Sequence, residues 1–200
     1  ESYMKLSKKT DFESYMLFRN WANTLLNDTN DIDMAMADSS EVYEDLYQIQ
    51  KLQSITDEKI ESALIFWKMI PKIISEFKTQ LSSNNLATKG LCHIYAKENI
   101  DIFSQANKDY SFIFLGLNSL SNTEQFIINY LLENNDSDIY WDCDESFFLN
   151  KEHEAGYFFR KYKLEWDYYK NNEFKWVNKS FSNPKDIFIY QTTKQIAQAK

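Results

Sequence analysis

Glycine and proline are the residues that most restrict what this chain can fold into, because only three glycines and two prolines occur in its 200 residues. Folds made of many short strands need tight turns, and tight turns are rich in these two residues. A β-sandwich or β-barrel is therefore disfavoured, and a helix-rich chain is favoured. Hydrophobic residues make up 44% of the sequence, which is enough for one sizeable core or two small ones.

The first half of the chain shows helical periodicity almost throughout. Residues 10–26 open with the capping-box pattern Thr10-x-x-Glu13, and apolar residues then recur at helical spacing. Pro71 falls inside a long helical pattern, and we expect a kink or a restart there because proline lacks an amide donor. The expected elements are a helix over 10–26, an acidic connector over 27–38, and helices from Ser39, from Thr56 and over 88–99.

The second half alternates short apolar runs with helical patterns. Residues 110–117, "YSFIFLGL", are typical of a strand buried on both faces. A capping box at Ser121-x-x-Glu124 starts the next helix. Further strands are predicted at 138–142 and 186–191, with a helix between them. This order implies an α/β fold with a parallel sheet and crossover helices.

The predicted organisation is a helical subdomain over residues 1–108 followed by a partial α/β domain over residues 109–200. Three strands make an incomplete sheet. The sequence starts without methionine and ends in "TTKQIAQAK", which has the pattern of a helix just beginning. We therefore expect an internal piece of a longer polypeptide.

Charge and cysteine content narrow the possible functions. The formal charge of -8 disfavours a sequence-independent grip on DNA by the whole surface. Cys92 and Cys143 are too few for a disulfide scaffold and suit a reducing cytoplasm. No apolar run approaches the ~20 residues that span a bilayer, so no membrane partner is expected.

Residues 160–179 depart from the acidic average, because cations outnumber acids there and aromatic residues lie between them. Such a segment can stack on and follow single-stranded nucleic acid. The alternative is an amphipathic helix with a solvated basic face. The cations are Arg160, Lys161, Lys163, Lys170, Lys175 and Lys179.

Two carboxylates follow the predicted strand at 138–142. Asp142 and Asp144 stand where open α/β sheets bind ligands, although acids at such positions also cap the next turn or helix. Glu173-Phe174-Lys175 completes the order of a PD-(D/E)XK nuclease, in which carboxylates hold Mg²⁺ and a lysine assists the attacking water. The intervening chain, however, has the pattern of a long helix rather than a hairpin.

Other chemical sites find less support. Cys92, His93, Cys143 and His153 lack the paired spacing of a zinc site, and the chain has no GxxxxGK[ST] phosphate loop.

The second half resembles the motor domain of superfamily 1 helicases of the UvrD and RecB kind. In "IYWDCDESFF", Asp142, Asp144 and Ser146 fit the family pattern Gly-Asp-x-x-Gln-Ser-aliphatic-Tyr, with Glu145 where the family has its sensing Gln. The family's preceding Asp-Glu pair is replaced by Leu115-Gly116. Since that pair holds Mg²⁺ in active motors, the resemblance implies a helicase-like, P-loop-NTPase-like fold without ATPase chemistry.

A closer resemblance is to AddB-type subunits of helicase–nucleases, PD-(D/E)XK exonucleases whose helicase region has decayed. "GLNSLSNTE", residues 116–124, is similar to their Gly-Phe-x-x-Leu-Thr-x-x-Glu segment, and Glu154-Ala155-Gly156 with Arg160 matches a Glu-Ala-Gly-x-x-x-Arg helix. The resemblance implies a parent protein that processes DNA double-strand breaks for recombinational repair beside an active helicase subunit. It implies no cofactor in this region, with Mg²⁺ a cofactor of the parent at most.

The sequence therefore predicts a non-catalytic helicase-like scaffold that contacts single-stranded DNA or a partner. We expect Asp142 and Asp144 to organise the turn and helix after their strand rather than to hold a metal. The alternatives are a free-standing Mg²⁺-dependent nuclease using Asp142, Asp144, Glu173 and Lys175, or a protein-interaction module. The candidate DNA contacts are Asn118, Ser119, Asp142, Asp144, Glu145, Ser146, Arg160, Lys161 and Lys163.

Overall fold

Long amphipathic helices and a few short strands make up the computed structural model, which describes residues 12–53, 58–176, 179–181 and 183–189. The chain is mixed α/β, mostly helical, with a small parallel sheet. It divides into two compact units. The first, Glu1–Phe112 with Ser119–Asp138, is called the helical unit, and the second, Ile113–Asn118 with Ile139–Lys200, is called the α/β unit.

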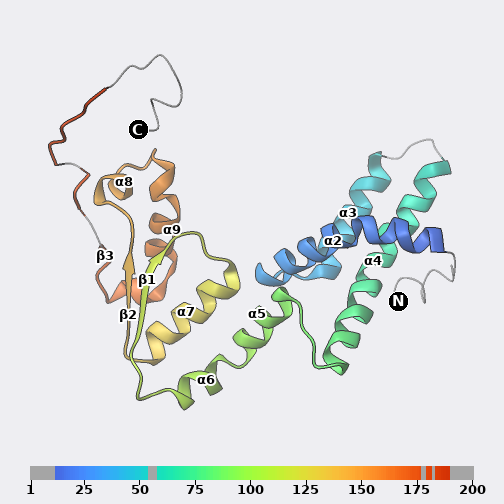
Figure 1. Ribbon diagram of the computed structural model, residues 1–200, viewed down its shortest axis with the longest axis horizontal. Helices are drawn as coiled ribbons and strands as arrows, with labels where there is room; N and C mark the ends of the chain where they lie inside the picture. Colours follow the sequence, from blue (N-terminus) through green and yellow to red (C-terminus); the bar gives the residue numbers. More distant parts are fainter. Residues whose placement is uncertain (1–11, 54–57, 177–178, 182, 190–200) are drawn as a thin grey trace. The chain divides into compact units, whose positions relative to one another are not determined.

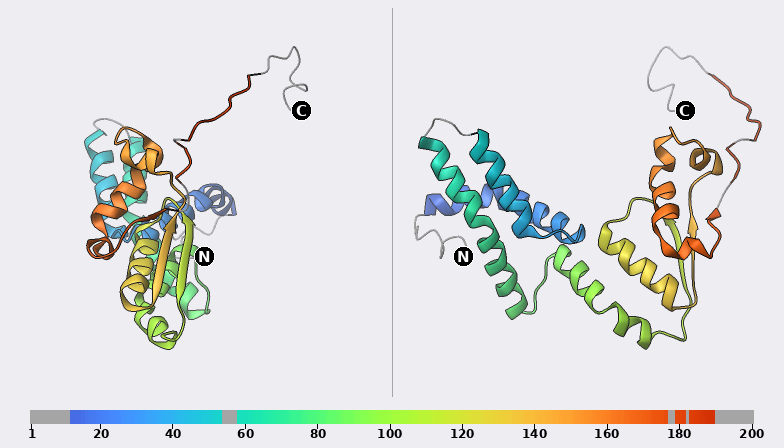
Figure 2. Two further views of the ribbon diagram at one scale, coloured as in Figure 1. Left: turned by 90° about the vertical axis from the view of Figure 1, so that its left-hand side faces the viewer. Right: turned by 180° about the vertical axis from the view of Figure 1, so that it is seen from behind.

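Three long helices form the first part of the helical unit: α2 (Phe12–Met34), α3 (Ser39–Gln53) and α4 (Glu58–Ser83). In Figures 1 and 2, α3 runs alongside α4 and α2 crosses them. Their apolar stripes meet around the buried residues Tyr43, Ile70 and Ile74. Burying these side chains, rather than helix propensity alone, stabilises such helices.

The second part of the helical unit contains α5 (Lys89–Glu98), α6 (Ile100–Ala106) and α7 (Asn122–Asn134). The end of α2 lies close against α5, because a Cβ on Gly90 would be 2.7 Å from the Cβ of Asp33. The start of α7 also binds the end of α2: Asn122 donates to the Ala35 carbonyl at 2.8 Å, and Thr123 donates to that of Met34 at 3.2 Å.

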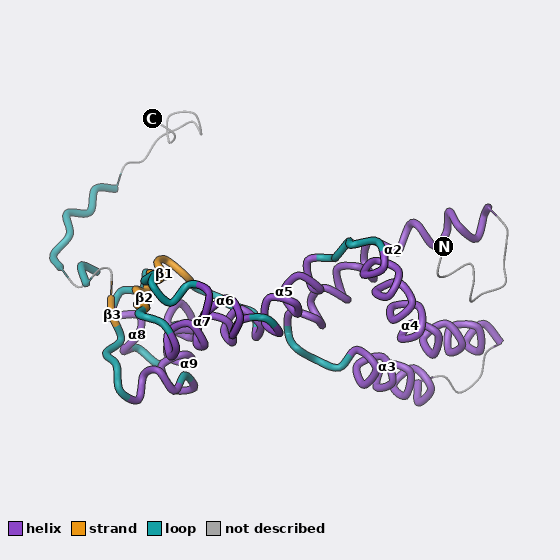
Figure 3. Tube along the Cα trace, turned by 90° about the horizontal axis from the view of Figure 1, so that it is seen from below, coloured by secondary structure: helices purple, strands orange, loops and turns teal. Residues whose placement is uncertain are grey.

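The α/β unit is built on a sheet of order β1-β2-β3, with β1 at Phe112–Leu117, β2 at Ser137–Trp141 and β3 at Lys175–Trp176 (Figure 3). β2 and β3 are parallel, with Tyr140 opposite Lys175 and Trp141 opposite Trp176. Short helical segments join them: α8 (Glu145–Leu149), η1 (Glu154–Gly156), α9 (Tyr157–Glu165) and η2 (Asp167–Lys170).

Trp141 is the centre of the α/β unit and is fully buried. Its ring lies within 6 Å, centroid to centroid, of four other aromatic rings, and its Nε1–H donates to the Tyr169 hydroxyl at 2.6 Å. The four rings are those of Phe159, Tyr162, Trp166 and Phe174.

Several predicted elements are confirmed. The 88–99 pattern forms α5, with the Thr88 hydroxyl accepting from the Leu91 N–H. The capping box of Ser121 and Glu124 begins α7. The apolar runs at 110–117 and 138–142 form β1 and β2. Thr10 of the first capping box lies outside the described residues.

Two predictions in the helical unit are wrong. The acidic connector over 27–38 is helical as far as Met34, because Thr29 and Asp33 continue the inward face of α2 and are buried. Of the two outcomes expected at Pro71, the restart does not occur, because α4 runs through the proline. Ile70, Ile73 and Ile74 are buried on either side of that proline, and their packing offsets the lost hydrogen bond.

Three predictions in the α/β unit are also wrong. β1 is not buried on both faces, since it lies at a sheet edge and exposes Ile113 and Leu115. Residues 186–189 form no strand, and the third strand is β3, which pairs with β2; Tyr190 and Gln191 lie outside the described residues. The long helix expected before Glu173 is broken into α8, η1, α9 and η2.

Across the described ranges, no helix combines the length and the apolarity needed to cross a membrane.

Candidate nucleic-acid interface

The turn after β2 is organised by Asp144. Its Oδ1 accepts from the Ser146 N–H at 2.9 Å and caps α8, while its Oδ2 accepts from the Phe181 N–H at 2.8 Å. These backbone N–H groups lower the pKa of the Asp144 carboxyl. Asp144 therefore has the structural role expected from the sequence. Asp142 is exposed beside it.

Arg160 closes the other end of α8. Its Nη1 donates to the carbonyls of Phe147 at 2.9 Å and Asn150 at 2.9 Å, and its Nη2 donates to that of His153 at 2.9 Å. Longer bonds reach the carbonyls of Phe148 and Lys151. This guanidinium satisfies carbonyls that the end of a short helix leaves without partners. Its donors are committed to the fold, which leaves few for a phosphate.

Gly156 explains why Glu154-Ala155-Gly156 and Arg160 occur together. A Cβ at position 156 would lie 2.2 Å from the Phe147 carbonyl oxygen and 2.3 Å from Arg160 Nη1. Only glycine allows the backbone to approach so closely. The motif that resembles the helicase–nuclease helix thus has a structural role within this unit, since it allows η1 to pack against the end of α8.

A groove of about 620 Å³ opens on the α/β unit beside α8, α9 and β3. Lysines and aromatic residues from separated parts of the sequence line it together. We call it the basic–aromatic groove. Its lining residues are Tyr140, Glu145, Phe148, Leu149, Lys163, Asn172, Glu173, Phe174, Lys175 and Lys179.

Two of the three lysines in this groove lie over aromatic rings. Lys163 Nζ is 5.2 Å from the centre of the Phe148 ring, and Lys175 Nζ is 5.2 Å from that of Tyr140. Lys179 Nζ lies 3.5 Å from Glu145 Oε1 in a solvent-exposed pair. Exposed pairs of this kind contribute only about 0–1 kcal/mol, so an incoming anion can compete for the lysine.

The sequence-predicted contacts are distributed unevenly. Glu145 and Lys163 line the basic–aromatic groove, whereas Lys161 forms an ion pair with Glu165 at 3.9 Å. Asn118 and Ser119 are exposed directly after β1. The Ser146 side chain is partly buried, and its N–H is used by Asp144.

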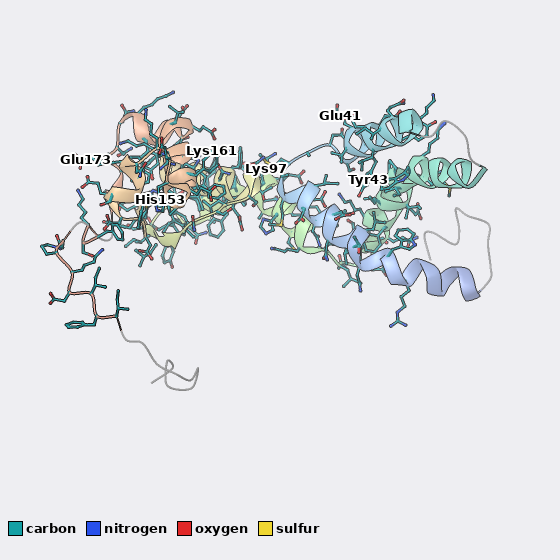
Figure 4. The ribbon with its side chains drawn as sticks, turned by 90° about the horizontal axis from the view of Figure 1, so that it is seen from above. Glu41, Tyr43, Lys97, His153, Lys161 and Glu173 are labelled. Atoms are coloured by element: carbon teal, nitrogen blue, oxygen red, sulfur yellow. The ribbon has the colours of Figure 1, made fainter. Side chains whose placement is uncertain are left out.

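Sequence reasoning missed the groove residues Tyr140 and Phe148, whereas Lys179 was among the cations of the basic segment 160–179. Tyr140 alternates with the buried Ile139 and Trp141, so the period of two along β2 could have placed it on the opposite face. Lys175 was predicted both as a cation of the basic segment 160–179 and as the lysine of the alternative nuclease. Figure 4 labels Lys161, His153 and Glu173 on the α/β unit.

The pairing of β2 with β3 does not set the carboxylates of the alternative nuclease opposite one another. The paired residues are Tyr140 with Lys175 and Trp141 with Trp176, so Glu173 comes before the first pair and Asp142 after the last. Among the described residues, no group of three or more His, Cys, Asp or Glu side chains is placed to hold a metal ion.

Comparisons with protein-family models, with curated proteins and with solved structures gave no match. The resemblance to helicase–nuclease subunits therefore rests on the motif residues alone. What the α/β unit can bind follows from the groove itself, whose aromatic faces and cations are the groups that contact nucleic-acid bases and phosphates.

Proposed function

We propose that the α/β unit contacts single-stranded DNA through the basic–aromatic groove, as a non-catalytic scaffold within an AddB-like exonuclease subunit. The observation that carries the proposal is the meeting of three lysines and three aromatic residues in one groove. Cations neutralise phosphates while aromatic faces stack on bases of any sequence. The parent's part in double-strand-break processing, its P-loop-like ancestry and its helicase partner belong to the same proposal.

The interaction energies favour a movement of the lysine ammonium groups from the aromatic rings to phosphates when a strand binds. A cation over an exposed ring is worth about 0.5–1 kcal/mol, whereas a base stacked on an aromatic side chain is worth about 1–3 kcal/mol. A bound strand can therefore take the Tyr140 face from Lys175, and the freed ammonium then meets a phosphate. Glu145 and Glu173 limit the net charge of the lining to one positive, which makes the contact modest rather than tight.

The test is binding of a fluorescently labelled single-stranded oligonucleotide to the full chain, measured by anisotropy over a range of salt concentrations. Three lysine–phosphate contacts predict a slope of log K against log salt of about -2. Lys163→Gln and Lys175→Gln should each reduce the magnitude of that slope by about 0.7. Tyr140→Leu should weaken binding about tenfold, because it removes a stacking face.

Lys161→Gln is the matched control, since Lys161 lies two residues from Lys163 on α9 but does not line the groove. It should leave the slope unchanged. Binding that is insensitive to salt, or equally reduced by Lys161→Gln and Lys163→Gln, would contradict the proposal. Mg²⁺-dependent cleavage abolished by Asp144→Ala would instead support the nuclease alternative.

A further inference from the structure

A second groove, of opposite character, lies in the helical unit between α2, α3 and α4. Its volume is about 720 Å³. The lining is largely aliphatic and aromatic, with two carboxylates. The lining residues are Trp21, Thr24, Leu25, Asp28, Asp31, Ile32, Val42, Tyr43, Leu46, Trp67 and Ile70.

The floor of this groove is continuous with the core of the helical unit. Tyr43 and Ile70 are 3% and 1% exposed, and partly buried side chains, among them Leu25 and Leu46, pack against them. Since Tyr43 and Ile70 are already out of water, the apolar surface that a partner can cover belongs to the partly buried side chains. Covering it gains roughly 25 cal/mol per Å² of apolar surface removed from water.

The rim of this groove is acidic. Asp28 and Asp31 line it, and both are exposed. The stretch 28–45, which holds the end of α2 and the start of α3, contains seven Asp and Glu residues and neither Lys nor Arg. Glu41, Glu44 and Asp45 line a further hollow on the outer side of α3. In Figure 4, Tyr43 lies toward α4 and Glu41 on the outer side.

We infer that this acidic-rimmed groove binds an amphipathic basic helix of a partner protein. The apolar face of such a helix, with anchors at i, i+3 or i+4, and i+7, covers the floor. Lysine or arginine residues beside that face meet Asp28 and Asp31. Charge complementarity decides the partner's chemistry. Asp33 is paired with Lys78, but the other six carboxylates of residues 28–45, a stretch without Lys or Arg, repel an acidic helix and steer a basic one toward the groove.

A small apolar molecule fits these observations less well. It would use the floor but leave the rim carboxylates partly desolvated without a counter-charge, which costs free energy. It would also make no use of the acids that continue along α3 beyond the groove.

The test uses the full chain and three labelled peptides of about fifteen residues. The first has leucines on one helical face and lysines on the other. The second has glutamates in place of the lysines, and the third has the composition of the first in an order without an apolar face. We expect the first peptide to bind at least about tenfold more tightly than either of the others.

The rim is tested by the double variant Asp28→Asn and Asp31→Asn, which keeps both side chains polar and of the same size. It should weaken binding of the first peptide about tenfold, since two exposed ion pairs are lost. Asp101→Asn is the matched control, because Asp101 is exposed on α6 in the same unit and does not line the groove. It should change the affinity less than about twofold.

The location is tested by methyl NMR of the unaltered chain. The first peptide should shift the methyl signals of Leu25, Val42 and Leu46, and leave those of Ile128 and Leu131 in place. Equal binding of all three peptides, or shifts that do not centre on the groove, would overturn the inference. So would an apolar dye that fills the groove and is not displaced by the first peptide, which would identify a small-molecule site.

Discussion

Different interactions stabilise the interior of the helical unit and the interior of the α/β unit. In the helical unit, elements as long as 26 residues bury aliphatic side chains, among them Ile70, Ile73 and Ile74. In the α/β unit, α8 has five residues, α9 has nine and β3 has two, and the core is mostly aromatic. Elements this short have little stability of their own, so large side chains and side-chain bonds to backbone carbonyls must hold them.

The surfaces of the two units differ as well. Residues 12–53 carry eight acids and two bases, whereas residues 139–200 carry nine acids and ten bases. The net charge of -8 therefore hides an acidic part and a nearly neutral part with a local cluster of lysines. One chain thereby offers a groove suited to anions and a groove suited to cations, and substitutions that affect one unit alone test this division.

The largest expected effect is that of Trp141→Ala. Removing a fully buried indole that contacts four aromatic rings should lower the free energy of unfolding of the α/β unit by about 4 kcal/mol. Hydrogen exchange should accelerate in α9 while amides in α3 and α4 keep their protection. Trp141→Phe, which keeps a ring, should cost less. Equal loss of protection in both units would show that they share one core.

Lys78→Met tests the helical unit in the same way. Lys78 Nζ lies 2.5 Å from Oδ1 of Asp33, whose side chain is only 4% exposed. Without the lysine, that carboxylate is buried with no counter-charge, which should cost about 3 kcal/mol in chemical denaturation. Lys68→Met, on the exposed face of α4, is the control and should be nearly neutral. A Lys78→Met variant as stable as the wild type would mean that water solvates Asp33.

The variants Gly156→Ala and Gly116→Ala compare two roles of glycine, which are close approach of the backbone and a left-handed backbone conformation. The Cβ added at position 156 meets the Phe147 carbonyl and Arg160, so α8 and η1 must separate, at a cost of about 2 kcal/mol. Gly116→Ala has no atom within 4 Å to displace but a φ of +71°, and should cost about 1 kcal/mol. Thermal or urea unfolding of the two variants measures the difference. A smaller loss of stability for Gly156→Ala than for Gly116→Ala would show that η1 can move away from α8 at little cost.

Local chemistry could be predicted from the sequence where both partners lie within a few residues. The Ser121–Glu124 capping box and the role of Asp144 at the start of α8 are of this kind. Apolar runs also located β1 and β2. The run at 186–189 has the same composition and forms no strand, because a strand exists only when another strand pairs with it.

The remainder could not be predicted because it depends on distant contacts. Arg160 was expected to face DNA, yet its partners are carbonyls between Phe147 and His153 that come within reach only through Gly156. The basic–aromatic groove likewise needs the register of β2 with β3, which sets Lys175 beside Tyr140. The continuation of α2 through its acidic residues depends on the burial of Thr29 and Asp33.

The smallest expected effect is a pH dependence of stability, and it involves one helix-capping carboxylate in each unit. In α8, the N–H groups of Ser146 and Phe181 lower the pKa of Asp144. At α7, burial alone would raise the pKa of the Glu124 carboxyl. Hydrogen bonds from the backbone N–H and the hydroxyl of Ser121 together lower it by more, so the pKa lies below its ordinary value. A lowered pKa means that each carboxylate stabilises the folded state fully above its ordinary pKa.

That stabilisation is lost as the pH falls from about 4 through the lowered pKa values. Amide signals of Ser146 and Phe181 should therefore move below about pH 4, and Asp144→Asn should abolish the pH dependence while keeping a capping side chain. Asp142→Asn, the exposed neighbour, should leave the titration of these amides unchanged. If Phe181 moves with Ser146, one carboxylate joins the start of α8 to the chain after β3; if only Ser146 moves, that link is absent in solution, and the α/β unit loses one of the contacts that offset its short elements.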